Sequence, residues 1–210
     1  MIMNLKSKIY VAGHRGLVGS AILQELKKKG FKKIIIADRK RLDLTNQIEV
    51  LRFLKKKKPN FIFIAAAKVG GIYSNKKYKG QFIYENLMIQ TNLIHSAFLC
   101  KIKNLIFLGS SCIYPKKSKQ PIKEDYLLNG KLEETNDAYA VAKIAGIKMC
   151  ESYNAQYRTN YKCLMPTNIF GPNDNYHTLN SHFIPSLIKK IHALKIKNQK
   201  ILTLWGNGKA

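Results

Sequence analysis

Hydroxyl and thiol side chains follow directly on an apolar run in "NLIFLGSSC", which spans residues 104–112. The run is typical of a buried strand, and it ends in Ser110, Ser111 and Cys112. Ligands of open α/β sheets bind at the carboxyl ends of strands, so this position indicates small-molecule chemistry. Cys112 is either a titratable group near the substrate or a buried structural thiol, which is the usual state of a free cysteine.

A tyrosine and a lysine lie four residues apart in "YAVAK", at Tyr139 and Lys143. On a helix the two side chains share one face. We expect the charge of Lys143 to lower the pKa of the Tyr139 phenol, which could then exchange a proton near neutral pH. Ser110 can hydrogen-bond the substrate oxygen that Tyr139 protonates, with Ser111 as the nearby alternative.

Three glycines, Gly13, Gly16 and Gly19, lie in "GHRGLVG" between a predicted strand and a predicted helix. Such a turn lets backbone N–H groups approach a pyrophosphate at the start of the helix. The alternative is a purely structural turn, since glycine turns are common. The strand–turn–helix context favours a dinucleotide site.

The residues after the second apolar run bear on which dinucleotide would bind. Asp38 could accept a hydrogen bond from a ribose 2′-hydroxyl, which favours NAD. Arg39 and Arg15 bring two guanidinium groups, which suit a 2′-phosphate and favour NADP. Alternatively, Asp38 pairs with a neighbouring cation and Arg39 is solvated. We expect NADP(H), because a dianion gains more from two guanidinium groups than it loses to one aspartate.

These groups need a framework, and apolar runs that alternate with helical patterns supply one. The predicted strands span residues 8–13, 32–38, 60–67, 103–111 and 161–170. The predicted helices span residues 19–30, 45–59, 82–102 and 138–157, and residues 68–81 and 111–137 read as irregular. Strands that are apolar throughout and separated by helices indicate an α/β fold with a doubly wound parallel sheet of the Rossmann type.

Composition narrows the function classes. The 210 residues carry a formal charge of +25, which could indicate binding to nucleic acid or to an acidic surface. Only five of the 37 basic residues are arginine, and the lysines fall at predicted helix ends and in loops. A dedicated nucleic-acid binder more often uses arginine and interleaved aromatic residues, so we expect compositional drift and no specific nucleic acid.

The four cysteines form no CxxC motif and no cluster with metal-ligand spacing, so no metal site is expected. The N-terminus enters a predicted strand without a long apolar signal region, and no apolar run is long enough to span a bilayer. We therefore expect a cytoplasmic chain with reduced thiols and no membrane contact.

Longer motifs connect these features to one enzyme family. The segments "AGHRGLVGSAI", "AAAKVGGI", "FLGSSCIYPK", "YAVAKIAGIKMCESYN", "MPTNIFGPNDNYH" and "SHFIPSLI" together resemble the GDP-L-fucose synthases. These are GDP-4-keto-6-deoxy-D-mannose 3,5-epimerase/4-reductases of the extended short-chain dehydrogenase/reductase family. "KVGGI" and "GSSCIYPK" are much more specific than the glycine turn or the tyrosine–lysine spacing.

The resemblance implies a role for individual residues. Ser110, Tyr139 and Lys143 resemble the reductive triad, and Cys112 and His182 resemble the acid/base pair of the two epimerisations. By itself His182 could equally be a polar residue near a helix start. The residues that match cofactor contacts are Gly13, His14, Arg15, Gly16, Leu17, Val18, Gly19, Arg39, Ala65, Ala66, Ala67, Leu108, Gly109, Ser110, Ser111, Lys143, Pro166, Thr167, Asn168, Ile169 and His182. Substrate positions are matched by Asn168, Lys190 and Trp205.

The implied reaction is NADPH-dependent 3,5-epimerisation and 4-reduction of a GDP-4-keto sugar. Members of the resembled family continue well past "LWGNGK", whereas this sequence ends at Ala210. We therefore expect a Rossmann domain over residues 1–175 and the beginning of a smaller sugar-nucleotide-binding lobe over residues 176–210. The alternatives are an inactive, truncated nucleotide-binding remnant and another NAD(P)-dependent sugar-nucleotide epimerase or dehydratase.

Two long helical segments, residues 82–102 and 138–157, carry apolar residues on more than one face. One face can cover the sheet, and the other needs a partner or its own chain. In the resembled family these helices pair as a four-helix bundle, so we expect a homodimer. Leu93 and Ile147 are among the apolar side chains expected at such an interface.

Overall fold

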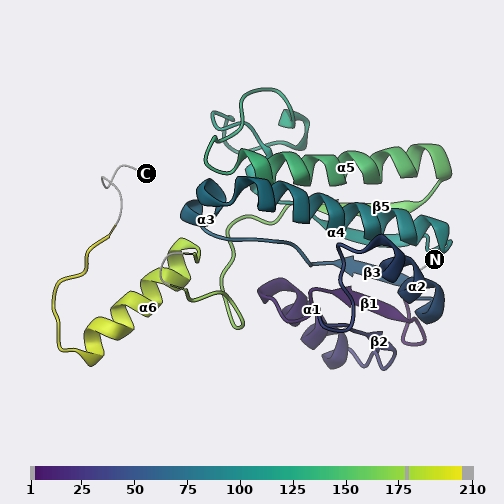
Figure 1. Cartoon of the computed structure of the whole chain (residues 1–210), viewed down its shortest axis with the longest axis horizontal. Helices are drawn as coiled ribbons and strands as arrows, with labels where there is room; N and C mark the ends of the chain where they lie inside the picture. The colour runs from purple at the N-terminus through teal and green to yellow at the C-terminus, as the bar shows by residue number, and fades with distance from the viewer. Residues whose placement is uncertain (1–2, 178–179, 205–210) are drawn as a thin grey trace.

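Parallel strands form the centre of the computed structural model, which describes residues 3–177 and 180–204 (Figure 1). Within these residues the sheet has five strands in the order β2-β1-β3-β4-β5, and every neighbouring pair is parallel. The strands are β1 (Ile9–Ala12), β2 (Ile34–Ile35), β3 (Phe61–Ile64), β4 (Asn104–Leu108) and β5 (Asn160–Leu164). The predicted α/β fold with a parallel, doubly wound sheet is confirmed.

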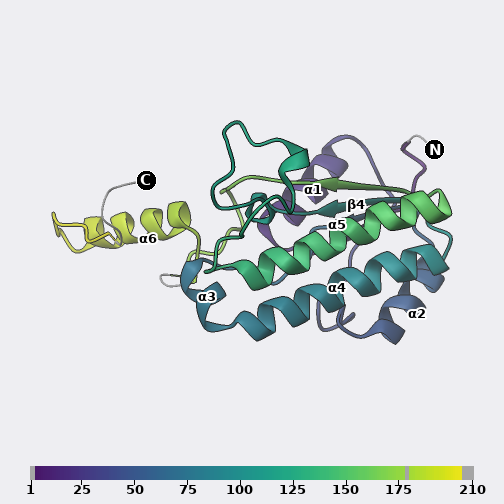
Figure 2. The same cartoon turned by 90° about the horizontal axis from the view of Figure 1, so that it is seen from above.

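Helices connect the strands and cover both faces of the sheet (Figure 2). The helices are α1 (Leu17–Lys28), α2 (Gln47–Lys57), α3 (Ile72–Lys77), α4 (Lys79–Leu99), α5 (Asp137–Tyr157) and α6 (Phe183–Ile196). In the view from above, α2, α4 and α5 lie on one face, and α1 lies on the other (Figure 2). This arrangement follows from right-handed crossovers that turn in opposite directions on the two sides of β1.

Alternation along the strands divides the core into two layers. Tyr10 and Ala12 face the α2, α4 and α5 side, where most of the buried side chains gather. Ile9 and Val11 face the other side and pack with Leu26 of α1. All four strand residues are fully buried, which places the amino-terminal strand at the centre of the molecule.

Several predicted boundaries were wrong in detail. Residues 68–81 were expected to be irregular, but Ile72–Lys77 form α3 and α4 already begins at Lys79. β2 has two residues where seven were predicted, and β5 ends at Leu164 instead of continuing to residue 170. Residues 111–136 are irregular as predicted, apart from two short 3₁₀ turns, and α5 begins at Asp137.

Helix α6 stands away from the sheet and its covering helices (Figures 1 and 2). Its apolar side chains are largely exposed, with Phe183 at 63% and Ile196 at 69%, and Pro185 is its one buried residue. The division at residues 175/176 stays a prediction. Within residues 3–177 and 180–204, the structure contains no helix long and apolar enough to cross a membrane.

Candidate active site

The ends of β1 and β3 meet where the strand order reverses, the position at which doubly wound sheets bind ligands. Gly13 follows β1 with φ +83°, and a Cβ at this position would lie 2.6 Å from the Ala66 backbone nitrogen. Both the positive φ and this close approach require glycine. The glycine turn after β1 (residues 13–19) and the alanines after β3 (residues 65–67) therefore lie against each other. We call the surface that they form the glycine floor.

The glycine turn also brings α1 close to the floor. A Cβ on Gly19 would overlap the Gly13 carbonyl oxygen, so the missing side chain lets the helix pack against the turn. Gly16 begins α1 without a side-chain cap. The N–H groups of an uncapped first turn are suited to an anion such as a pyrophosphate.

A cleft of about 1350 Å³ opens above this floor. It runs from the carboxyl ends of the strands to the start of α6. Its lining residues come from segments between Gly13 and Leu204. All but three of the residues predicted for catalysis, cofactor or substrate line this one cleft. Sequence reasoning thus selected side chains that the fold brings together from seven separate segments.

Lys143 is buried at the base of the cleft, with 3% of its surface exposed. Its Nζ donates a hydrogen bond to the Leu108 carbonyl oxygen at 2.7 Å. The same atom lies 4.7 Å from the Phe107 ring centroid and 5.7 Å from the Tyr139 ring centroid. Burial lowers the pKa of Lys143 to about 8, so the ammonium keeps its charge only up to mildly alkaline pH.

The expected lowering of the Tyr139 pKa was wrong. The pKa of the Tyr139 phenol is raised to about 12, mainly by burial and also by the nearby Cys112, although a hydrogen bond with Ser110 lowers it. Lys143 does not reverse this balance, because its ammonium points to the Leu108 carbonyl. Tyr139 is therefore a neutral phenol at physiological pH, and it can donate a proton but not accept one.

Cys112 and His182 line the same cleft from different elements. Cys112 lies in the 3₁₀ turn after β4, where its backbone N–H donates to Ser110 Oγ at 3.3 Å. His182 is the exposed N-cap residue directly before α6. The contact between Ser110 and the turn fixes the direction of the Ser110 and Cys112 side chains after the end of β4.

The acidic residue after β2 is already engaged. Asp38 Oδ2 pairs with Arg15 Nη2 at 3.1 Å, and Asp38 Oδ1 accepts the Arg41 backbone N–H at 3.1 Å. The alternative in which Asp38 pairs with a neighbouring cation thus describes the observed contacts. The side chains of Arg15 and Arg39 are 76% and 77% exposed, which leaves both guanidinium groups within reach of a ligand.

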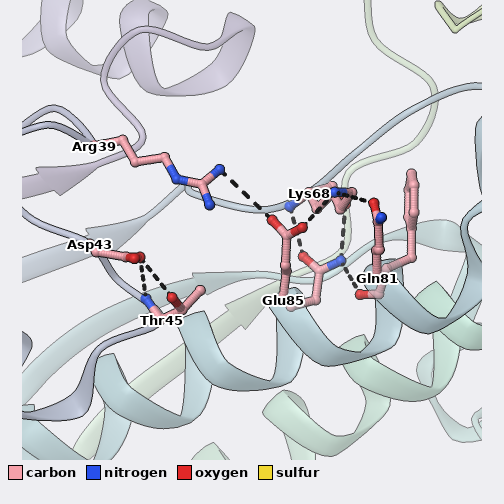
Figure 3. A network of polar contacts seen from close by, with 8 residues as sticks. Arg39, Asp43, Thr45, Lys68, Gln81 and Glu85 are labelled. Carbon is pink, nitrogen blue, oxygen red and sulfur yellow. Dashed lines mark hydrogen bonds and ion pairs between the residues drawn. The ribbon is translucent and has the colours of Figure 1, made fainter.

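Sequence reasoning missed a charged network beside the cleft (Figure 3). Lys68 Nζ contacts Glu85 Oε1 at 2.5 Å and Gln81 Oε1 at 3.0 Å, and Arg39 Nη1 lies 3.9 Å from Glu85 Oε2. The Asn86 side chain bonds both the backbone N–H and the carbonyl of Lys68. Lys68 and Glu85 line the cleft. Lys68 is the first residue of "KVGGI", to which no role had been given, whereas no motif marked Glu85.

Buried polar atoms without a partner gather at the cleft. Seven such side-chain atoms occur among the described residues, and five belong to residues that line it. These five are His14 Nδ1, Asn75 Oδ1, Asn136 Oδ1, Asp174 Oδ2 and Ser181 Oγ. Buried polar groups are normally satisfied, so this concentration indicates a polar ligand. Together with the glycine floor and the uncapped helix start, it fits a dinucleotide.

Comparison with known proteins places the chain in a family. Residues 9–210 match the NAD-dependent epimerase/dehydratase family. The chain belongs to this family. The resemblance to GDP-L-fucose synthases is also confirmed: this chain is 50% identical over 207 residues to putative GDP-L-fucose synthase 2 of Arabidopsis thaliana and 48% identical over 203 residues to GDP-L-fucose synthase of Escherichia coli.

These alignments cover 99% and 97% of this chain, but 63% of each relative. The chain therefore spans less than two thirds of the length of the relatives that it matches. Among solved structures, MlghC, a GDP-mannoheptose C4 reductase from Campylobacter jejuni with NADP bound, is 42% identical with a TM-score of 0.86. That match covers 93% of this chain and 60% of the reductase.

Three predicted site residues are not among those that line the cleft. Gly19 lies behind the turn, where it packs α1 against Gly13 and does not line the cleft. Ser111 faces a separate cavity of about 260 Å³, because the 3₁₀ turn directs it away from Ser110. Trp205 lies outside the described residues. Within the described residues, no group of three or more His, Cys, Asp or Glu side chains could hold a metal ion.

Proposed function

We propose that this chain carries the cofactor site and catalytic groups of a GDP-L-fucose synthase. The reaction is NADPH-dependent 3,5-epimerisation and 4-reduction of GDP-4-keto-6-deoxy-D-mannose. One observation carries the proposal: Ser110, Cys112, Tyr139, Lys143 and His182 line a single cleft. The identity of about half of the residues to named GDP-L-fucose synthases supports the same reaction.

The dinucleotide would lie over the glycine floor, with its pyrophosphate at the start of α1. NADPH, when bound, supplies the hydride that reduces C4 of the sugar. Arg15 and Arg39 are the residues that would bind a 2′-phosphate, because both guanidinium groups are exposed at the rim beside β2. The NADP bound to the Campylobacter reductase supports this choice over NAD.

The epimerisations need a base on one face of the sugar and an acid on the other. Protons at C3 and C5 are acidic because each carbon adjoins the C4 carbonyl. Cys112 and His182 approach the cleft from different elements, so one can remove a proton while the other returns one to the opposite face. Ser110 and Tyr139 donate hydrogen bonds to the C4 oxygen and stabilise the enolate.

Reduction then uses the same oxygen site. Tyr139, with its pKa at about 12, enters the step as a neutral phenol and protonates the C4 oxygen. The Lys143 ammonium lies close to the ring and stabilises the phenolate that forms. Asn168 and Lys190 line the cleft towards α6, and we assign them to the sugar nucleotide.

We further propose a cytoplasmic homodimer that pairs through α4 and α5. The interface expected from the sequence needs revision, because Leu93 and Ile147 are 0% and 4% exposed within their own chain. The outer surfaces of the two helices instead carry exposed Tyr84, Leu99 and Val141. Sedimentation as a monomer at micromolar concentration would remove the dimer from the proposal.

A second candidate is 4-reduction without epimerisation. The 42% identity to a Campylobacter enzyme named as a C4 reductase favours it. In this alternative Cys112 and His182 would take no part in proton exchange at carbon. The substrate would then leave the cleft with its C3 and C5 configurations unchanged.

One assay separates these functions. The chain is incubated in D₂O with GDP-4-keto-6-deoxy-D-mannose and NADPH, alone and fused to the region that follows the matched part of the Escherichia coli relative. GDP-L-fucose synthase activity predicts NADPH oxidation and deuterium at C3 and C5. Reduction without deuterium supports the C4 reductase. NADPH binding without oxidation in either form would leave a nucleotide-binding remnant and contradict the proposal.

Variants assign the steps to residues. Cys112→Ser should lose deuterium exchange, and it should still reduce the unepimerised ketone slowly. Tyr139→Phe should lower hydride transfer by about 100-fold or more, because no acid then faces the C4 oxygen. Wild-type exchange in the Cys112→Ser variant would exclude this thiol from the epimerisation.

A further inference from the structure

Two cysteines outside the catalytic cleft face each other between α5 and β5. The two elements are held in register by Asn154, whose Nδ2 donates to the Tyr161 carbonyl at 2.7 Å and whose Oδ1 accepts the Tyr161 N–H at 2.9 Å. The chain reverses direction between α5 and β5, so moving back along the helix corresponds to moving forward along the strand.

One helical turn back from Asn154 leads to Cys150, about 6 Å along the axis. Two residues forward from Tyr161 lead to Cys163, about 6.6 Å along the strand and on the same face of the sheet. The equal offsets bring the two thiols opposite each other. Both side chains belong to the same apolar layer of the core.

The thiols are in direct contact. The Cys150 S–H donates a hydrogen bond to the Cys163 sulfur, which raises the pKa of Cys150 and lowers the pKa of Cys163. Burial raises the pKa of Cys150 further. Cys163 is therefore the partner that more readily forms the thiolate, and Cys150 is a protonated thiol held against it.

Solvent reaches this pair from the cavity of about 260 Å³ beside β5. Cys163 is half-buried and lines the cavity, whereas Cys150 is completely buried behind it. The cavity wall also includes Ser111, Tyr114 and Glu124, so it is partly polar and can admit a molecule as small as hydrogen peroxide.

We propose that Cys150 and Cys163 form a dithiol that peroxide converts to a disulfide. The Cys163 thiolate attacks one peroxide oxygen, the O–O bond breaks, hydroxide leaves, and a sulfenic acid remains. The Cys150 sulfur then attacks the sulfenic sulfur, the S–O bond breaks, and the hydroxyl leaves with the Cys150 proton as water. Two thiols lose two electrons in total, and one peroxide is reduced to two waters.

A disulfide between Cys150 and Cys163 would join β5 to α5, which also carries residues of the catalytic cleft. Helix α5 carries Tyr139 and Lys143 as well as Cys150. On the strand side, the Leu164 carbonyl that follows Cys163 accepts the Gly109 N–H at 2.8 Å, next to the carbonyl that holds Lys143. A disulfide would fasten the catalytic helix to the strand that leads into the cleft.

The test is a peptide map of the wild-type chain. The reduced chain is treated with one equivalent of hydrogen peroxide, alkylated with iodoacetamide and digested with trypsin without reductant. The proposal predicts that the peptide of residues 149–158 is linked to that of residues 163–189, lighter by two hydrogen atoms and separable by dithiothreitol. Both cysteines recovered in alkylated form, or Cys163 as sulfinic acid without the link, would overturn it.

Matched variants control the assignment. Cys163→Ser should reduce the cross-linked fraction to background, and Cys100→Ser, at a half-buried cysteine outside the pair, should leave it unchanged. A Cys150 link to any other cysteine in the wild-type chain would contradict the register of α5 against β5. If Cys163→Ser does not fold, the wild-type map alone decides.

Discussion

The two walls of the cleft differ in how the chain supports them. On one side, the four residues of β1 are fully buried, and the turn after β1 contacts the backbone after β3. On the other side, α6 buries Pro185 and exposes about half or more of Phe183, Ile188, Ile191 and Ile196. The wall built on β1 and β3, the supported wall, is packed against the rest of the chain. In the wall built on α6, the α6 wall, no other described residues cover the apolar side chains.

We expect this difference to separate cofactor binding from substrate binding. The glycine floor, Lys143 and Tyr139 belong to the supported wall, so we expect NADPH binding to need no further contacts. His182 and Lys190 belong to the α6 wall, so we expect epimerisation and sugar binding to depend on how α6 is held. An exposed apolar helix face is normally covered by another element or a partner.

The largest expected effect compares one substitution in both regions. Leu93→Glu places a carboxylate at a fully buried position of α4, and it should lower the free energy of unfolding by about 4 kcal/mol or more. Ile191→Glu, at a 50% exposed position of α6, should change it by less than about 0.5 kcal/mol. Urea unfolding measures both. Equal losses would mean that α6 is buried in solution.

The glycine floor provides the next test. Gly19→Ala forces a methyl group against the Gly13 carbonyl, and it should cost about 2–3 kcal/mol in stability and weaken NADPH binding at least tenfold. Gly80→Ala is the matched control, because nothing lies within 4 Å of the added Cβ. Calorimetric titration should show unchanged NADPH affinity for the control. Equal affinity in both variants would disprove the role of the turn.

Because Lys143 is buried, we expect the free energy of unfolding to depend on pH. Its pKa is about 8 in the folded chain, against an ordinary value of 10.5 for a solvated lysine, so the unfolded chain binds more protons between these values. Stability relative to Lys143→Met should therefore rise by about 2 kcal/mol from pH 7 to pH 10. Urea unfolding of both proteins across this range measures the difference. A pH-independent difference would mean that the ammonium is solvated.

The smallest expected effect is on the affinity for NADPH, at the exposed arginines beside β2. Arg39→Ala should raise the NADPH dissociation constant about tenfold and the NADH constant less than about twofold, because only NADPH carries the 2′-phosphate. Arg52→Ala removes an exposed arginine of α2 that does not line the cleft, and it serves as the control. A parallel loss of both affinities in Arg39→Ala would place the residue outside the 2′-phosphate site.

The sequence allowed the sheet and the gathering of the site to be predicted, because continuous apolar runs mark buried parallel strands whose ends must meet at one edge. Helix α3 escaped prediction, since "KVGGIYSNKK" has two glycines and no apolar period. Contacts from a distant segment hold it: the Asn180 carbonyl accepts the Gly71 N–H, and its side chain accepts from Ser74 Oγ.

The spacing of residues in the sequence also could not predict the direction in which a side chain points. Tyr139 and Lys143 do share a helix face, but the ammonium turns to the Leu108 carbonyl, and burial then sets the pKa of the phenol. In the same way, the contact between Lys68 and Glu85 joins a strand end to a helix 17 residues away and leaves no local pattern. Such tertiary pairs become visible only in the folded chain.

Calorimetric titration of the unmodified chain with NADPH and NADH tests the central claim most directly. If the sheet-supported wall is complete, NADPH binds saturably at one site per chain, at least about tenfold more tightly than NADH, without any sugar nucleotide. Absence of saturable NADPH binding by the folded chain, or tighter binding of NADH, would contradict the account.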